Sequence, residues 1–230
     1  MSERVLVVAA HPDDEILGCG ATMARHSQEG DSVFIAILGE GITSRDDCRE
    51  HGLDPRALRE LKEDARQAGE IVGAQQVFTF DLPDNRFDSL DLLDVVKIIE
   101  RLKMMTQPTV VYTHHAGDLN IDHTITQRAV LTAFRPLDSH QPRAIYAFEV
   151  PSATGWNAPT PENGFWPTHY VQVEETLPTK IAAMEAYRSE RRRWPHPRSP
   201  RALEVWAQRR GLEVGLEAAE AFVPLRTLCR

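Results

Sequence analysis

The sequence predicts an α/β fold in which helices cover both faces of a mostly parallel sheet, giving three layers. Two observations support this prediction. Short apolar segments rich in β-branched residues alternate with segments of helical length through residues 1–150. The apolar segments also lack the strict alternation of half-exposed strands, as is typical of strands that are buried on both faces of a parallel sheet.

Each predicted element has a local reason. The strands are apolar runs, expected at residues 4–10, 32–38, 76–80, 108–113 and 144–150. The helices between them are expected at residues 16–29, 55–72, 90–105 and 122–134. Gly30 ends the first helix, because glycine readily adopts the left-handed conformation that follows many helices. The second helix has Asp54 as its N-cap and Pro55 at its first position, and Gly73 ends it.

Residues 151–230 do not continue this alternation. They predict a long loop, a strand, a helix, a proline-interrupted basic stretch and a last helix, at residues 151–168, 169–173, 178–190, 191–201 and up to about 210. We therefore predict a single domain over residues 1–230. Its core is residues 1–150, and residues 151–230 form a smaller extension that completes the pocket and contributes contacts to an expected homo-oligomer.

Composition excludes some classes of function. The chain has 230 residues and a net charge of -8, which argues against general binding of nucleic acid. No stretch approaches the roughly 20 apolar residues of a transmembrane helix, and no segment resembles a signal peptide, so no membrane partner is expected. Cys19, Cys48 and Cys229 match neither a zinc cluster nor a disulfide framework. We expect reduced thiols and a cytoplasmic location.

Two clusters of histidine and aspartate follow predicted strands, at residues 11–15 and 114–123. Ligands of open parallel sheets bind at the carboxyl ends of the strands, where these clusters would meet. His11, Asp14 and His123 could ligate zinc and leave one position open for water. Asp13 could take a proton from that water, and Asp122 could orient a ligand imidazole. The same residues are also compatible with a helix cap and a hydrogen-bonded turn, and the residue types alone leave both interpretations open.

The segment Ala-His-Pro-Asp-Asp-Glu at residues 10–15 closely resembles the signature of the LmbE/PIG-L-like family of N-acetylglucosaminyl deacetylases. Residues 41–45, 82–86, 120–123, 180–187 and 211–222 are also similar to segments of this family. The resemblance implies a Rossmann-like fold and a zinc ion, which iron or another divalent metal could replace. It further implies that His11, Asp14 and His123 are the metal ligands and that Asp13 is the general base. The implied reaction removes an N-acetyl or related N-acyl group from a small amino sugar or sugar conjugate.

One position departs from the family. Many members have histidine where this chain has Asn120, which can donate a hydrogen bond to an oxyanion but cannot act as a general acid. The proton for the departing amine would then come from Asp13 or from one of the adjacent residues His114 and His115. Adjacent residues of an extended segment point to opposite faces, so one of the two should face the pocket. We assign His115 to catalysis and His114, with Arg45, to substrate binding.

Other functions remain open at this level. A deformylase or another amidase acting on a non-sugar N-acyl metabolite would share the same site. A catalytically silent module that binds a metal or a nucleotide would share the same fold. A dinucleotide oxidoreductase is not supported, because the turn after the first strand is His-Pro-Asp-Asp and not a glycine-rich phosphate loop.

Overall fold

The computed structural model describes residues 2–45, 47, 49–137, 140–158 and 160–229. A seven-stranded sheet with the strand order β3-β2-β1-β4-β5-β7-β6 forms its centre. The strands from β3 to β5 are parallel, and β7 and β6 continue the sheet in antiparallel fashion. Their bounds are β1 Arg4–Ala9, β2 Ser32–Gly39, β3 Gln76–Leu82, β4 Val110–His114, β5 Ala144–Phe148, β6 His169–Gln172 and β7 Ala219–Thr227.

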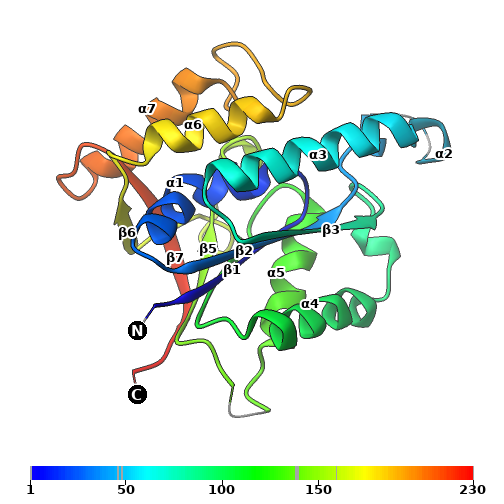
Figure 1. Ribbon diagram of the computed structural model, residues 1–230, viewed down its shortest axis with the longest axis horizontal. Coiled ribbons are helices and arrows are strands. Elements are labelled where there is room, and N and C mark those ends of the chain that lie inside the picture. Colours follow the sequence, from blue (N-terminus) through cyan, green and yellow to red (C-terminus); the bar gives the residue numbers. More distant parts are fainter. Residues whose placement is uncertain (1, 46, 48, 138–139, 159, 230) are drawn as a thin grey trace.

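Helices cover both faces of the sheet, which confirms the predicted three-layer α/β fold (Figure 1). On one face lie α1 Asp14–Gln28, α3 Pro55–Ile71 and α6 Leu177–Ala186, and on the other lie α4 Leu92–Thr106 and α5 Ile121–Ala133. The helix α7 Pro200–Leu212 packs against α6 and β7. Short helical turns are α2 Arg49–Gly52, η1 Thr43–Arg45, η2 Phe87–Ser89 and η3 Thr154–Trp156. None of the helices in the described ranges is both long enough and apolar enough to span a bilayer.

The central strand β1 explains why the apolar runs do not alternate with polar residues. Successive side chains of a strand point to opposite faces. Val5 and Val7 belong to the core under α1, α3 and α6, whereas Leu6 and Val8 belong to the core over α4 and α5. All four side chains are completely buried, so both faces of the strand must be apolar.

The helix α1 is bent in its middle, where Cys19 leaves the helical conformation with φ -148° and ψ 26°. A buried ion pair satisfies the backbone groups that this bend releases. Lys180 Nζ donates to the carbonyl of Leu17 and lies 2.6 Å from Glu220 Oε1. The same carboxylate accepts from the amides of Ala21 and Thr22. Residues of α6 and β7 thereby hold the helix that begins at the candidate site.

The structure corrects two predictions for residues 151–230. The strand β7, Ala219–Thr227, was not predicted, although it connects β5 to β6 and completes the sheet. The helix expected to reach residue 190 ends at Ala186, because Tyr187 adopts φ -75° and ψ 75°. Residues 187–190 therefore leave the helix, and Glu190 becomes available to the candidate site.

Candidate functional site

The first polar cluster lies in the sharp turn between β1 and α1. Asp13 has φ 88° and ψ -24°, a left-handed conformation that asparagine and aspartate tolerate better than most residues. This conformation lets the chain reverse within three residues, so that the amide of His11 donates to Asp14 Oδ2 at 3.0 Å. All three side chains are buried at the carboxyl end of β1.

The second cluster follows β4, the neighbour of β1 in the sheet. The N-cap of α5 is Asn120, whose side-chain oxygen accepts from the amide of Asp122 at 2.9 Å. This cap places Asp122 and His123 in the first turn of α5, where both are buried. Because β1 and β4 are parallel neighbours, the two clusters meet at one edge of the sheet, as the sequence predicted.

Three side chains of the two clusters present a set of donor atoms suited to one metal ion. His123 Nε2 lies 3.0 Å from Asp14 Oδ2, and His11 Nδ1 lies 3.3 Å from the same oxygen. One donor atom from each residue lies within 4.8 Å of the others. Tetrahedral zinc with bonds of about 2 Å separates its ligand atoms by roughly 3.3 Å, so the set fits a zinc ion.

The second nitrogen of each histidine faces a carboxylate. Asp122 Oδ2 lies 2.9 Å from His11 Nε2, so Asp122 contacts the histidine of the first cluster. His123 Nδ1 lies 3.1 Å from Asp118 Oδ2. Asp84 Oδ1 also lies 3.3 Å from His11 Nε2. Such outer carboxylates fix the orientation of ligand imidazoles and raise their basicity.

The electrostatics of the cluster favour a positive charge. Burial lowers the pKa of His11, but Asp122 and Asp14 outweigh it and raise the value to about 10. Burial likewise opposes the effect of Asp14 and Asp118 on His123, yet they raise its pKa to about 9. Burial would raise the pKa of Asp14, but His123 and His11 hold it well below its usual range. The carboxylates that stabilise the protonated forms of His11 and His123 could therefore stabilise a bound divalent cation in place of those protons.

Asp13 lies beside this donor set and differs from it. Its carboxylate is completely buried, and neither oxygen makes a hydrogen bond to another described residue. Burial raises the pKa of Asp13 to about 8, while the nearby Arg198 lowers it. A buried carboxylate without a hydrogen bond is unusual, and a carboxylate with a raised pKa is suited to exchange protons with water.

The other residues singled out in the sequence occupy varied positions. His114 is fully buried, accepts from the amide of Ala10 at 2.8 Å through Nε2, and stacks on His123 with ring centroids 3.9 Å apart. Burial lowers the pKa of His114 well below its usual value. His115 donates to the carbonyl of Asn163 at 3.0 Å. The side chain of Arg45 lies outside the described part of the structure.

A cavity of about 190 Å³ opens over the cluster. His11, Asp14, His123 and Asn120 line it, but Asp13, His114 and His115 do not. Contrary to our expectation, neither member of the adjacent histidine pair therefore faces this cavity. The lining also includes polar residues that the sequence did not single out for catalysis, namely Asp84, Asn85, Glu190 and Arg198.

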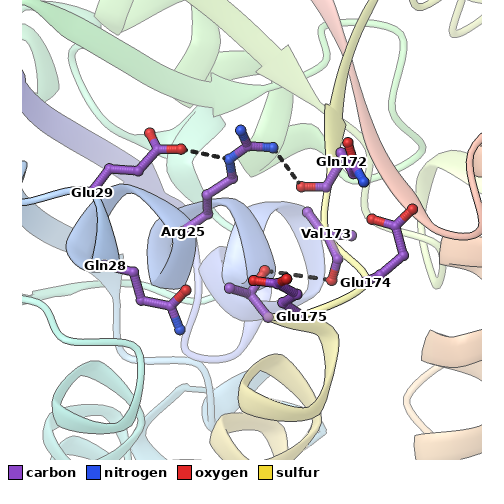
Figure 2. A pocket seen from close by; sticks show the side chains of 8 residues that line it. Arg25, Gln28, Glu29, Gln172, Val173, Glu174 and Glu175 are labelled. Carbon is purple, nitrogen blue, oxygen red and sulfur yellow. Dashed lines mark hydrogen bonds and ion pairs between the residues drawn. The ribbon is translucent and has the colours of Figure 1, made fainter.

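A larger hollow elsewhere on the surface lacks a cluster of histidine and aspartate. It measures about 310 Å³ and lies between the end of α1 and the segment after β6 (Figure 2). Arg25 crosses it, and donates to Glu29 at 2.8 Å and to the carbonyl of Gln172 at 2.9 Å. Because Arg25 already pairs with Glu29 and no histidine lines this hollow, we place the chemistry in the smaller cavity.

Known proteins match the part of the chain that carries both clusters. The family model PIG-L, described as GlcNAc-PI de-N-acetylase, matches residues 6–134, which include both clusters. The chain is 27% identical over 191 residues to the uncharacterized deacetylase YaiS of Escherichia coli K12, covering 80% of this chain and 90% of that protein. It is 25% identical over 209 residues to the diacetylchitobiose deacetylase of Thermococcus kodakarensis, covering 82% and 70%.

The fold is shared more widely. The crystal structure of 4-carboxy-2-hydroxymuconate hydratase from Pseudomonas putida KT2440 matches with a TM-score of 0.76 at 19% identity, over 98% of this chain and 97% of that one. At this identity the match shows a common fold and not a common reaction. The family model, in contrast, spans more than half of the sequence. The chain therefore belongs to the PIG-L (GlcNAc-PI de-N-acetylase) family.

Proposed function

We propose that the chain is a zinc-dependent hydrolase that removes an N-acetyl or related N-acyl group from an amino sugar or sugar conjugate. One observation carries this proposal: the donor atoms of His11, Asp14 and His123 converge beside the buried carboxylate of Asp13, which makes no hydrogen bond to another described residue. Three protein ligands with an open position are typical of catalytic zinc. The relatives include a diacetylchitobiose deacetylase, which supports the class of substrate.

The residues divide the work as follows. When bound, zinc lowers the pKa of a coordinated water toward about 7 and polarises a carbonyl oxygen. Asp13 takes the proton from the attacking water. Asn120 lines the cavity and can donate its amide N–H to the developing oxyanion. Asp122 and Asp118 hold the two ligand histidines in the required orientation.

The departing nitrogen must also receive a proton. A new C–O bond replaces the C–N bond of the amide, and the products are a carboxylate and an amine. Asn120 cannot transfer a proton, the Nε2 atom of His114 already accepts from the amide of Ala10, and His115 donates to the carbonyl of Asn163. The Asp13 carboxylate makes no hydrogen bond to another described residue, so we assign this step to Asp13. The carboxylate that accepts the proton of water thus returns it to the amine, and its pKa, raised by burial, suits both steps.

A direct assay tests the proposal. Zinc-loaded and chelator-treated protein would be incubated with N-acetyl sugars and sugar conjugates, and released amine and acetate would be quantified. We expect turnover only in the zinc-loaded protein and loss of most turnover in Asp13→Ala without loss of zinc. Full activity of Asp13→Ala would refute its role as the base. Absence of amine release from every N-acyl compound would refute the function itself.

A second reaction type serves as the main alternative. The chain is also 25% identical over 210 residues to the 4-oxalmesaconate hydratase of Pseudomonas putida KT2440, covering 84% of this chain and 76% of that protein. A hydratase adds water without breaking a C–N bond. The assay separates the two reactions, because hydration releases neither amine nor acetate. A deformylase acting on a non-sugar metabolite would instead release formate.

Two further properties belong to the proposal. Cys19 and Cys229 are free thiols, which supports a reducing, cytoplasmic location. Trp156 and Trp166 are 58% and 66% exposed on the extension, which supports contacts between subunits of a homo-oligomer. Size-exclusion chromatography with light scattering would measure the oligomeric state.

A further inference from the structure

The carboxylate of Asp13 forms an ion pair with an arginine from the extension. Arg198 Nε lies 3.2 Å from Asp13 Oδ2, and the Arg198 side chain is 24% exposed. Arg198 comes from the proline-rich segment between α6 and α7, 185 positions after Asp13 in the sequence (198 − 13). We propose that Arg198 is a positioning residue that fixes the orientation of the Asp13 carboxylate. This inference rests on the proposed function, in which Asp13 is the base.

Asp13 needs an external anchor. A carboxylate rotates easily about its terminal bond, because that torsion has a broad energy profile. Hydrogen bonds normally limit this rotation, but no described residue makes one to either oxygen of Asp13. An ion pair to Oδ2 holds one oxygen at the arginine and leaves Oδ1 directed elsewhere. The contact with Arg198 then fixes the Asp13 carboxylate through Oδ2 alone.

The arginine is itself held in place. Its Nη1 donates to Glu190 Oε2 at 2.7 Å, and the Glu190 carboxylate is 4% exposed. Its backbone amide donates to His196 Nδ1 at 3.1 Å, and the next residue, Ser199, is the N-cap of α7. A guanidinium is planar and rigid, so fixing Nη1 on Glu190 also fixes the direction of Nε toward Asp13. Glu190, Arg198 and Asp13 thus form a brace from the extension to the base.

Glu190 reaches the cavity because the helix α6 ends before it. If α6 continued to residue 190, Glu190 would lie on a helix, but α6 ends at Ala186 and the chain turns toward the cavity. Both Glu190 and Arg198 line that cavity. The brace is therefore a product of the loop between α6 and α7, and lysine in place of Arg198 could not span both carboxylates with a rigid fork.

Matched variants test the role. Arg198→Ala and Arg198→Lys would be compared with Arg192→Ala, because Arg192 Nη2 approaches the same Glu190 oxygen at 3.8 Å. We expect kcat to fall by about 10- to 100-fold in both Arg198 variants, as a small misplacement of a reacting group can cost about that much. KM and zinc content should stay within about twofold of the unmodified protein. Added guanidinium should restore part of the kcat of Arg198→Ala, and Arg192→Ala should retain full activity.

Crystal structures of the metal-free proteins give a readout that does not depend on turnover. We expect the Asp13 carboxylate to rotate or to occupy two conformers in Arg198→Ala, and to stay fixed in Arg192→Ala. An unchanged Asp13 in Arg198→Ala would overturn the proposal. A rise in KM with unchanged kcat would also overturn it, since that result assigns Arg198 to substrate binding. If the unmodified protein lacks turnover, the proposed function fails, while the structural comparison still tests the brace.

Discussion

Replacing Lys180 with methionine should destabilise the protein strongly. The Lys180 ammonium lies 2.6 Å from Glu220, donates to the carbonyl of Leu17, and its side chain is only 7% exposed. Methionine retains much of the side-chain volume but removes the charge and the donor. The Glu220 carboxylate, 5% exposed, would then be buried with only the amides of Ala21 and Thr22 as partners.

The expected size of the effect follows from these contacts. Removing one partner of a buried ion pair costs about 3–5 kcal/mol. For a chain of this size each kcal/mol lowers the melting temperature by about 2–4 °C, so Lys180→Met should lower it by about 6–20 °C. Glu220→Met should cost more, because it also leaves two amides of α1 without acceptors, at about 1–3 kcal/mol each. The double variant should cost less than the sum of the single ones, since it leaves no unpaired charge.

Thermal and urea unfolding followed by circular dichroism would measure these differences. Lys97→Met is a matched control, because the Lys97 side chain is 53% exposed and pairs with Glu100 on the surface of α4. Such an exposed pair contributes less than about 1 kcal/mol. If Lys180→Met lowered the free energy of unfolding no more than Lys97→Met, the buried pair would not stabilise the bend in α1.

Three further substitutions give separate tests. Asp118→Asn should weaken zinc binding by about 10- to 100-fold in a chelator competition, because the completely buried Asp118 carboxylate orients His123. Unchanged zinc affinity would contradict this role. Gly18→Ala should lower the free energy of unfolding, measured in urea, by about 1–3 kcal/mol, because the added Cβ would lie 2.2 Å from the ring of Phe148. An unchanged free energy of unfolding would show that this ring can move. His115→Ala should retain most turnover, because the His115 imidazole donates to the carbonyl of Asn163. A loss comparable to that of Asp13→Ala would return His115 to the catalytic group.

The parallel part of the fold follows from local sequence. Residues 5–10, which precede His11, are apolar at every position, because both faces of β1 are covered by helices. Asp54 accepts from the amide of Arg56 as the predicted N-cap of α3. The strand β7 escaped prediction because it contains Pro224 and gains its pairing only from β5 and β6, which are distant in sequence.

The candidate site likewise contains residues that the sequence identifies and contacts that only the fold provides. His11, Asp13 and Asp14 are contiguous, and His123 follows a strand that pairs with theirs, so motif and topology were sufficient to bring them together. Asp118 lay within the second cluster and could have been identified as a partner for His123 from its place in the same loop. No local pattern in the sequence links Arg198 to Asp13.

The sequence by itself determined the layered α/β architecture and the residues suited to hold a metal, because strand burial and the order of parallel strands follow from short-range patterns. Tertiary structure alone decided that Asp122 contacts His11 and that neither His114 nor His115 lines the cavity. It also brought Arg198 to Asp13. These contacts depend on the early end of α6 and on the path of the following loop. Both are set by packing between segments far apart in the chain, which no local pattern encodes.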